Sequence, residues 1–338
     1  MDFQRPILIA AILAVSFSLL LEWNKFQQAH QPAVPTVHQQ DAATDAPAAP
    51  AVTDGSVPEV PGAPAVTAVA PQQSQLVDVY TDTLQVKIDT VGGDLVMVAL
   101  RDYPTEIDKP DQPFVMLTRT AEQLYVAQSG LVGENGTDKG GERPHYHVEQ
   151  NRFDMADGSN ELVVNLLLQD NDGISITKRY IFTRGEHLVR IEYLVDNRSA
   201  QRWSAHLYGQ IKRDRHQPPS TGAVGLKPFL GAATTTAEKN YYKMTFDHMA
   251  DKPHKETVTG GWIAMVQHYF ISAWVPNAAD SNQFYTTHQK NSDTFLLGFT
   301  GPRVEVAPGS LGVLATQFYA GPKDVYRLEK LAPYLDLT

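Results

Sequence analysis

The chain of 338 residues contains no cysteine. This absence excludes a disulfide framework, a thiolate zinc site, an iron–sulfur cluster and a cysteine nucleophile. It also excludes a lipid-modified N-terminal cysteine. Every structural, redox or nucleophilic function that depends on a thiol is therefore ruled out for this chain.

Basic residues are scarce as well. The chain has 28 Lys and Arg against 38 Asp and Glu, so its formal net charge at pH 7 is 28 − 38 = −10. Nucleic-acid binding requires clustered cations that neutralise phosphates, so the charge balance predicts no nucleic-acid partner. Aromatic residues make up 9% of the sequence, which is enough for a sizeable core.

One apolar run stands out near the N-terminus. Residues 7–21 carry no charge, and at about 1.5 Å per residue they would form a helix about 22 Å long, against a bilayer core of about 30 Å. Extension to Trp23, an interfacial residue type, closes most of the gap. A cleaved secretory signal is the competing interpretation, but no clear small-residue cleavage site follows the run.

We therefore expect residues 1–26 to be a transmembrane signal-anchor. Arg5 and the α-amine precede the run, and the positive-inside tendency favours a cytoplasmic N-terminus. The side chains expected in the membrane are Ile7, Leu8, Leu13, Phe17, Leu20 and Trp23.

Residues 27–75 contain no aromatic residue, no Lys and no Arg, and they are rich in Ala, Pro and Gln. A segment that buries nothing cannot offset its ordering entropy. Alternating Ala, Pro and Val favour extended conformations. We expect a disordered linker that holds a folded domain away from a membrane.

From Leu76 onwards, apolar and polar residues alternate with period two, which is typical of strands with one buried face. In one run the shared face carries Ile174, Ile176, Lys178, Tyr180 and Phe182. Turn signals such as Gly92-Gly93 recur between the runs. We count about fourteen to eighteen candidate strands and no intervening helix, which predicts antiparallel sheets packed face to face over residues 76–321.

Residues 261–276 form a longer apolar run that is too polar at its centre for a membrane span. The run predicts two buried strands or one long bent strand. Its large side chains are expected to contribute much of the core area. They are Trp262, Tyr269, Phe270 and Trp274.

A helix is expected only at the end of the chain, over residues 322–338. Pro322 suits a first helical turn, and Asp324 suits the positive end of the helix dipole. The narrow apolar face, which we expect to pack at the membrane edge, carries Val325, Leu328, Leu331 and Leu335.

No catalytic motif is evident. His145 and His147 share one face of a predicted strand, a spacing that zinc sites sometimes use, but no third ligand is near in sequence. An exposed or hydrogen-bonded pair is the simpler interpretation. The glycine-rich segment 133–141 lacks the GK[ST] sequence of phosphate-binding loops. We expect no catalytic residue, no metal and no cofactor.

The segment 213–257 has prolines, glycines and mixed charges, and it mostly lacks clean alternation. Long irregular segments in compact domains are often functional surfaces, although a long connection without a function is the alternative. We expect a partner-binding surface here. Its candidate residues are Arg213, Arg215, Lys227, Tyr241 and Tyr242.

Several motifs together point to one family. The chain opens with MDFQR and an apolar run that closes on Trp23, and IDT at 88–90 precedes GGD at 92–94. GWIAMVQHYF at 261–270 is the most specific motif, and APYLDLT at 332–338 ends the chain. These motifs resemble the YidC membrane protein insertases of Gram-negative bacteria over the whole chain, with the linker similar only in character.

The resemblance implies a mainly β, antiparallel β-supersandwich, similar to sugar-mutarotase folds, with helices at the membrane edge. It implies an inner-membrane protein whose main domain is periplasmic and which is not an enzyme. Proteins of this family insert and fold inner-membrane proteins, alone or with the Sec translocon, and use no nucleotide. Their periplasmic domain is implicated in contacts with Sec accessory subunits. The membrane-embedded core that receives nascent inner-membrane proteins follows this region in the family and is expected to be missing here.

The alternative function is that of a membrane-anchored carbohydrate-binding or mutarotase-like protein. It rests on fold analogy, which is a weak argument because folds do not specify function. Such an enzyme needs an acid–base pair, usually His with Glu, in one cleft. The histidines to inspect are His145, His147, His206 and His268.

Overall fold

The computed structural model describes residues 57–58, 74–106, 108–139, 142–169, 173–217 and 228–338. The expected anchor and most of the expected linker lie outside these residues, as does Lys227. In the described part of the chain, no helix is long and apolar enough to cross a membrane.

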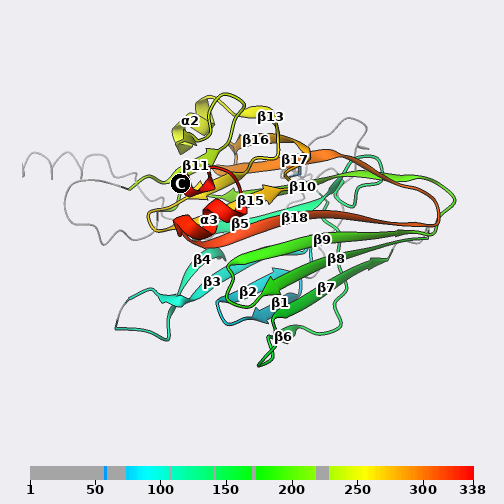
Figure 1. The fold of residues 1–338 in the computed structure, drawn as a ribbon, viewed down its shortest axis with the longest axis horizontal. Coiled ribbons are helices and arrows are strands. Elements are labelled where there is room, and N and C mark those ends of the chain that lie inside the picture. Colours follow the sequence, from blue (N-terminus) through cyan, green and yellow to red (C-terminus); the bar gives the residue numbers. More distant parts are fainter. Residues whose placement is uncertain (1–56, 59–73, 107, 140–141, 170–172, 218–227) are drawn as a thin grey trace, which may run out of the picture. The chain divides into compact units, whose positions relative to one another are not determined.

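The described strands form two sheets (Figure 1). The first sheet has ten strands, which are antiparallel except for the parallel pair β1 and β6. In spatial order they are β13 (Lys255–Thr259), β16 (Ser281–Gln289), β17 (Thr294–Val306), β10 (Trp203–Arg213), β5 (Leu124–Val132), β4 (Pro113–Arg119), β3 (Asp94–Pro104), β2 (Leu84–Asp89), β1 (Leu76–Tyr80) and β6 (Arg152–Asp154).

The second sheet has eight strands and is antiparallel throughout. In spatial order they are β12 (Tyr242–Met244), β11 (Gly231–Thr234), β14 (Ile263–Val266), β15 (Phe270–Pro276), β18 (Ser310–Pro322), β9 (Leu188–Asn197), β8 (Ile174–Thr183) and β7 (Glu161–Gln169). The eighteen described strands reach the upper end of the range expected from the alternation.

The apolar faces of both sheets meet in one core. Val86 and Ile211 come from the first sheet and Ile176 and Ile191 from the second, and all four are buried in the same cluster. Burial of apolar area is the main favourable contribution to folding. The predicted antiparallel sheets packed face to face are confirmed.

The apolar run at 261–276 forms two strands, β14 and β15, joined by a short turn. Ile263 and Met265 face the core between the sheets, whereas Trp262 and Ala264 face a second cluster. Both faces of this hairpin are buried, which explains why its sequence is almost continuously apolar. Tyr269 was expected in the core, but it lies in the turn and is 67% exposed.

The C-terminal helix is shorter than predicted. Pro322 still belongs to β18, where it pairs with Phe270, and α3 spans only Val325–Leu331. Asp324 is the N-cap, and its side chain accepts hydrogen bonds from two backbone amides of the first turn. A 3₁₀ turn, η1 (Leu335–Leu337), follows.

The second apolar cluster lies beneath α3 and η1. Leu328, Ala332 and Leu335 pack with Trp262 and Tyr319 of the second sheet, and the Trp262 Nε1 donates a hydrogen bond of 3.0 Å to the Pro333 carbonyl. The part of the second sheet around β14, β15 and β18 is therefore covered on both sides. A further short helix, α2 (Phe246–Asp251), was not foreseen.

Candidate functional site

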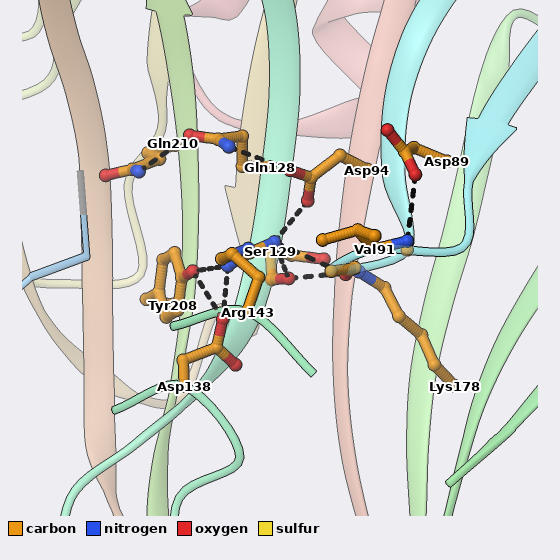
Figure 2. A network of polar contacts seen from close by, with 12 residues as sticks. Asp89, Val91, Asp94, Gln128, Ser129, Asp138, Arg143, Lys178, Tyr208 and Gln210 are labelled. Carbon is orange, nitrogen blue, oxygen red and sulfur yellow. Dashed lines mark hydrogen bonds and ion pairs between the residues drawn. The ribbon is translucent and has the colours of Figure 1, made fainter. Parts of the chain in front are cut away.

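A cluster of buried charges joins the two sheets (Figure 2). Asp94 begins β3 and Lys178 lies within β8, while Asp138 and Arg143 belong to the connection between β5 and β6. The exposed fractions are 6% for Asp94, 2% for Asp138 and 0% for Lys178. Two carboxylates thus face the side chains of Arg143 and Lys178 inside the protein.

Arg143 is the centre of this charged cluster. Its Nη1 donates to Asp138 Oδ1 and to the Tyr208 hydroxyl, and its Nη2 donates to Asp94 Oδ1. Burial opposes the guanidinium charge, but the attraction of Asp138 and Asp94 is larger in sum and raises the pKa of Arg143. Arg143 therefore remains protonated and pairs with both carboxylates.

Lys178 is held differently. Its Nζ donates to two backbone carbonyls, those of Gly92 at 2.9 Å and Ser129 at 3.0 Å. The ammonium also lies 5.4 Å and 5.3 Å from the ring centroids of Tyr180 and Tyr193. Burial lowers the pKa of Lys178 to about 7, even though Asp94 opposes the shift. Lys178 thus connects β8 of the second sheet to the first sheet.

Two glycines of the turn between β2 and β3 make room for these cations. Gly92 and Gly93 have φ values of 76° and 62°, in the left-handed region. A Cβ on Gly92 would collide with the Arg143 guanidinium, and one on Gly93 would lie 2.8 Å from the Cδ of Lys178. The Gly92-Gly93 turn expected from the sequence is therefore also required by the charged cluster.

Side-chain amides extend the network across the first sheet. Gln128 Nε2 donates to Asp94 Oδ2 at 2.7 Å, and Gln210 Nε2 donates to Gln128 Oε1 at 3.0 Å. The Tyr285 hydroxyl on β16 then donates to Gln210 Oε1 at 2.7 Å. Figure 2 shows the two glutamines in line with Asp94. Such networks fix the geometry of a core when their members are satisfied.

The charged cluster is best explained as a connection between the sheets. Its carboxylates are occupied by Arg143, and the Tyr208 hydroxyl, which donates to Asp138 Oδ1 at 3.1 Å, meets a carboxylate that Arg143 already neutralises. Among the described residues, no group of three or more His, Asp or Glu side chains is placed to hold a metal ion. The alternation placed Lys178 on an apolar face, which was the one signal of this cluster in the sequence.

The four histidines of the alternative function lie on different elements: His145 and His147 between β5 and β6, His206 on β10 and His268 between β14 and β15. His145 and His147 are exposed, the Nδ1 of His206 lies 3.0 Å from the Gly301 carbonyl, and His268 stacks on Tyr269 with ring centroids 3.9 Å apart. A hollow of about 450 Å³ lies beside β17, β18 and the end of α3, and none of these histidines lines it.

Only some residues of the candidate partner surface are exposed. Arg213 is 1% exposed, and its guanidinium lies against the rings of Tyr125 and Phe246. Its proposed place in the surface is therefore corrected, because as the last residue of β10 it points into the core. Arg215 remains partly exposed and pairs with Asp247 at 2.6 Å.

The two tyrosines of the candidate partner surface lie further along the same region. Both are half-buried, and Tyr241 packs on Trp262 with ring centroids 6.1 Å apart. The Tyr242 hydroxyl lies 3.2 Å from His248 Nε2. Arg215, Tyr241 and Tyr242 thus come from the end of β10 and the neighbourhood of β12 and α2, whereas Lys227 lies outside the described residues.

The C-terminal apolar face divides into a buried and an exposed side. Leu328 and Leu335 are buried against the second sheet and Leu331 is half-buried, whereas Val325 is 52% exposed. Further large apolar side chains of the C-terminal segment and of the β14–β15 turn are exposed, and the narrow predicted face missed them. They are Tyr269, Tyr326, Tyr334 and Leu337.

The two facing antiparallel sheets and the helix-covered C-terminal end define a large β domain of the two-sheet sandwich class. The family model of the YidC periplasmic domain matches residues 76–338, and its first matched residue is the first residue of β1. The chain belongs to the YidC periplasmic domain family.

Curated relatives support this assignment. The chain is 43% identical to a protein named membrane protein insertase YidC from Cellvibrio japonicus and 41% identical to one of the same name from Alcanivorax borkumensis. Both comparisons cover 100% of this chain but 61% of the relative. The chain thus spans about three fifths of the length of these relatives.

Solved structures with similar folds are distant in sequence. A galactose mutarotase related enzyme from Lactobacillus acidophilus shares 11% identity, with a TM-score of 0.49 over 73% of this chain and 97% of that one. A galactose mutarotase-like protein from Lactobacillus casei shares 11% identity, with a TM-score of 0.46 over 72% of this chain and 99% of that one.

Proposed function

We propose that this chain is the periplasmic portion of an inner-membrane protein insertase, and that it positions the insertase and contacts its partners. The observation that carries this proposal is the family match from β1 to the last residue, together with relatives named insertases. In this function the domain is a binding and positioning module and not an enzyme. Residues 1–26 would anchor it with a cytoplasmic N-terminus, and residues 27–75 would be the tether.

The C-terminal face is the part of the domain proposed to lie at the membrane edge. Tyr326 is 78% exposed, and Val325, Tyr334 and Leu337 are exposed on the same short helical segment. Tyrosines are enriched where proteins meet the bilayer interface, because one end of the side chain is apolar and the other is polar. Leu328 and Leu335 hold the segment on the second sheet.

The surface around Arg215, Tyr241 and Tyr242 is proposed to contact accessory subunits of the Sec translocon. Arg215 is flanked by Asp247 and Asp293, so a partner meets both signs of charge within one small area. Tyr and Arg are the residue types most often found at the centres of protein interfaces. Nascent inner-membrane proteins would be handled by the remaining part of a longer insertase.

Complementation of an insertase-depleted bacterium tests the proposed function. A relative's insertase whose periplasmic segment is replaced by residues 76–338 of this chain is expected to restore growth. Arg215→Glu is expected to reduce co-purification of Sec components, whereas Arg303→Glu, which reverses another exposed arginine, should not. Equal co-purification by both variants and by an unrelated periplasmic domain would exclude the partner contact.

A matched pair of variants tests whether α3 contacts the membrane. Tyr326 and Leu311 are both 78% exposed, but Leu311 lies at the start of β18 and not on the C-terminal face. Tyr326→Asp is expected to impair growth rescue, and Leu311→Asp should leave it intact. Equal growth with both variants would argue against membrane contact by α3.

A further inference from the structure

A hollow of about 370 Å³ lies beside the exposed side of α3. It is formed by the β14–β15 turn, the end of β18 and the end of β3. Half of its lining residues are aromatic. The lining residues are Tyr103, Tyr269, Phe270, Pro322, Lys323 and Asp324.

The aromatic walls are packed in place. Tyr103 meets Phe270 edge to face with ring centroids 5.5 Å apart, and Phe270 stacks on Phe114 at 4.4 Å. Tyr269, in contrast, is 67% exposed at the rim. The hollow therefore has two aromatic side chains that are packed in place and one that borders on solvent. Ring faces attract cations, and the recognition of ammonium ligands by aromatic cages uses this attraction.

A buried histidine packs next to Tyr103. His187 is 3% exposed, its ring centroid is 6.1 Å from that of Tyr103, and neither ring nitrogen has a hydrogen-bond partner. Burial and the nearby Arg327 lower the pKa of His187. A neutral imidazole has one nitrogen that donates and one that accepts a hydrogen bond, so His187 adds no positive charge beside Tyr103 that would oppose a bound ammonium.

Two side chains of opposite charge line the hollow. Lys323 and Asp324 are adjacent in sequence, and both line the hollow. The Asp324 carboxylate caps α3, and a carboxylate can accept further hydrogen bonds beyond those of a cap. Lys323 provides a cation for a phosphate. The pair thus matches a ligand that carries an ammonium and a phosphate close to each other.

We propose that this aromatic hollow binds the headgroup of a phospholipid that carries an ammonium group, with the ammonium over the rings of Tyr103 and Phe270 and the phosphate near Lys323. The proposal rests on the membrane-edge placement of α3 and specifies the ligand at that edge. The exposed apolar side chains beside the hollow, Val325 and Tyr326, would face the interfacial region of the same bilayer.

The test uses the full chain in a neutral detergent. Because the chain has no cysteine, Glu329→Cys provides a single site for an environment-sensitive fluorophore at an exposed position of α3 and leaves Tyr326 and the lining residues unchanged. The labelled protein is titrated with dihexanoyl phosphatidylethanolamine, dihexanoyl phosphatidylcholine and dihexanoyl phosphatidylglycerol below their micelle concentrations. Saturable binding is expected for the two ammonium lipids, and none for phosphatidylglycerol, which lacks the ammonium.

Variants of the labelled protein assign the binding to the hollow. Tyr269→Leu removes one aromatic wall, and Tyr334→Leu removes an exposed tyrosine of the same face outside the hollow. Tyr269→Leu is expected to raise the dissociation constant at least about fivefold, and Tyr334→Leu less than about twofold. Asp324→Ser removes the carboxylate while keeping a good N-cap residue, and it should weaken binding of both ammonium lipids.

Three results would overturn the proposal. They are phosphatidylglycerol binding as tightly as the ammonium lipids, equal effects of Tyr269→Leu and Tyr334→Leu, and binding of soluble phosphoethanolamine as tight as that of the lipid. The last result would assign the hollow to a soluble amine. In each case the same label, placed in phosphatidylglycerol nanodiscs, still reports whether α3 touches a bilayer, so failure of the headgroup site is distinguished from failure of the membrane-edge function.

Discussion

Replacement of Lys178 by Met should change how stability depends on pH. In the folded protein the pKa of Lys178 is lowered to about 7 by burial, against an ordinary value of 10.5. Between these values the unfolded chain binds a proton at this position that the folded chain does not. The free energy of unfolding of the wild type must therefore rise with pH through this interval, and the gain is lost as the pH falls toward 7.

The magnitude follows from the shift. One pKa unit corresponds to about 1.4 kcal/mol, and the full slope is reached only above the folded pKa. From pH 7 to pH 9, Lys178 should therefore add about 2 kcal/mol to the stability of the wild type. The Met variant has no titrating group at this position and should lack this increment. The carbonyls of Gly92 and Ser129 keep Arg143 as a donor, so they are not left unpaired in the variant.

Urea unfolding at pH 7 and pH 9 provides the assay, followed by the fluorescence of Trp203, Trp262 and Trp274, which are all buried. Lys255→Met is the control because Lys255 is exposed on β13. The difference between wild type and Lys178→Met should change by about 2 kcal/mol between the two pH values, and that for the control should stay constant. The same pH dependence in wild type and Lys178→Met would refute the assignment of a titrating, buried lysine.

Three further predictions concern the frame of the domain. Arg143→Met removes the cation that pairs directly with both buried carboxylates and should lower the free energy of unfolding by about 3–5 kcal/mol, as measured by urea unfolding; a loss below about 1 kcal/mol would contradict the charged cluster. Gly93→Ala combines a positive φ with a collision and should cost more than Gly158→Ala, which has a positive φ of 80° but open space, so equal midpoints would contradict the geometry. Trp262→Phe removes the hydrogen bond to Pro333 at a cost of about 1 kcal/mol, and amide hydrogen exchange in α3 should become faster while exchange in β8 stays unchanged.

The alternation of side chains predicted the strands because a period of two is a local property of the backbone. It placed Lys178 on the same face as Ile176 and Tyr180, and all three are buried. The sequence did not predict where that lysine would find its acceptors. Those are carbonyls of Gly92 and Ser129, in a turn and a strand of the other sheet, and contacts of this kind depend on the packing of the two sheets.

Errors arose where a local signal competed with sheet pairing. Pro322 suited a helix start, but pairing with Phe270 extends β18 through it. Arg213 was assigned to an irregular segment, although it is the last residue of β10 and its side chain turns inward onto Tyr125. Tyr269 was assigned to the core because its neighbours are apolar, but the turn between β14 and β15 exposes it.

The proposed surfaces and the charged cluster all lie on the same two packed sheets. The C-terminal face is held on β14, β15 and β18 by Leu328 and Leu335, and the other side of these strands belongs to the core between the sheets. The partner surface starts at the ends of β10 and β12, one strand from each sheet. Lys178 of β8 connects those two sheets through its buried hydrogen bond to the Ser129 carbonyl of β5, and Arg143 holds Asp94 beside it. A positioning module of the proposed kind would need its contact surfaces at a fixed separation, and the cross-sheet connection would supply that constraint without taking part in either proposed contact.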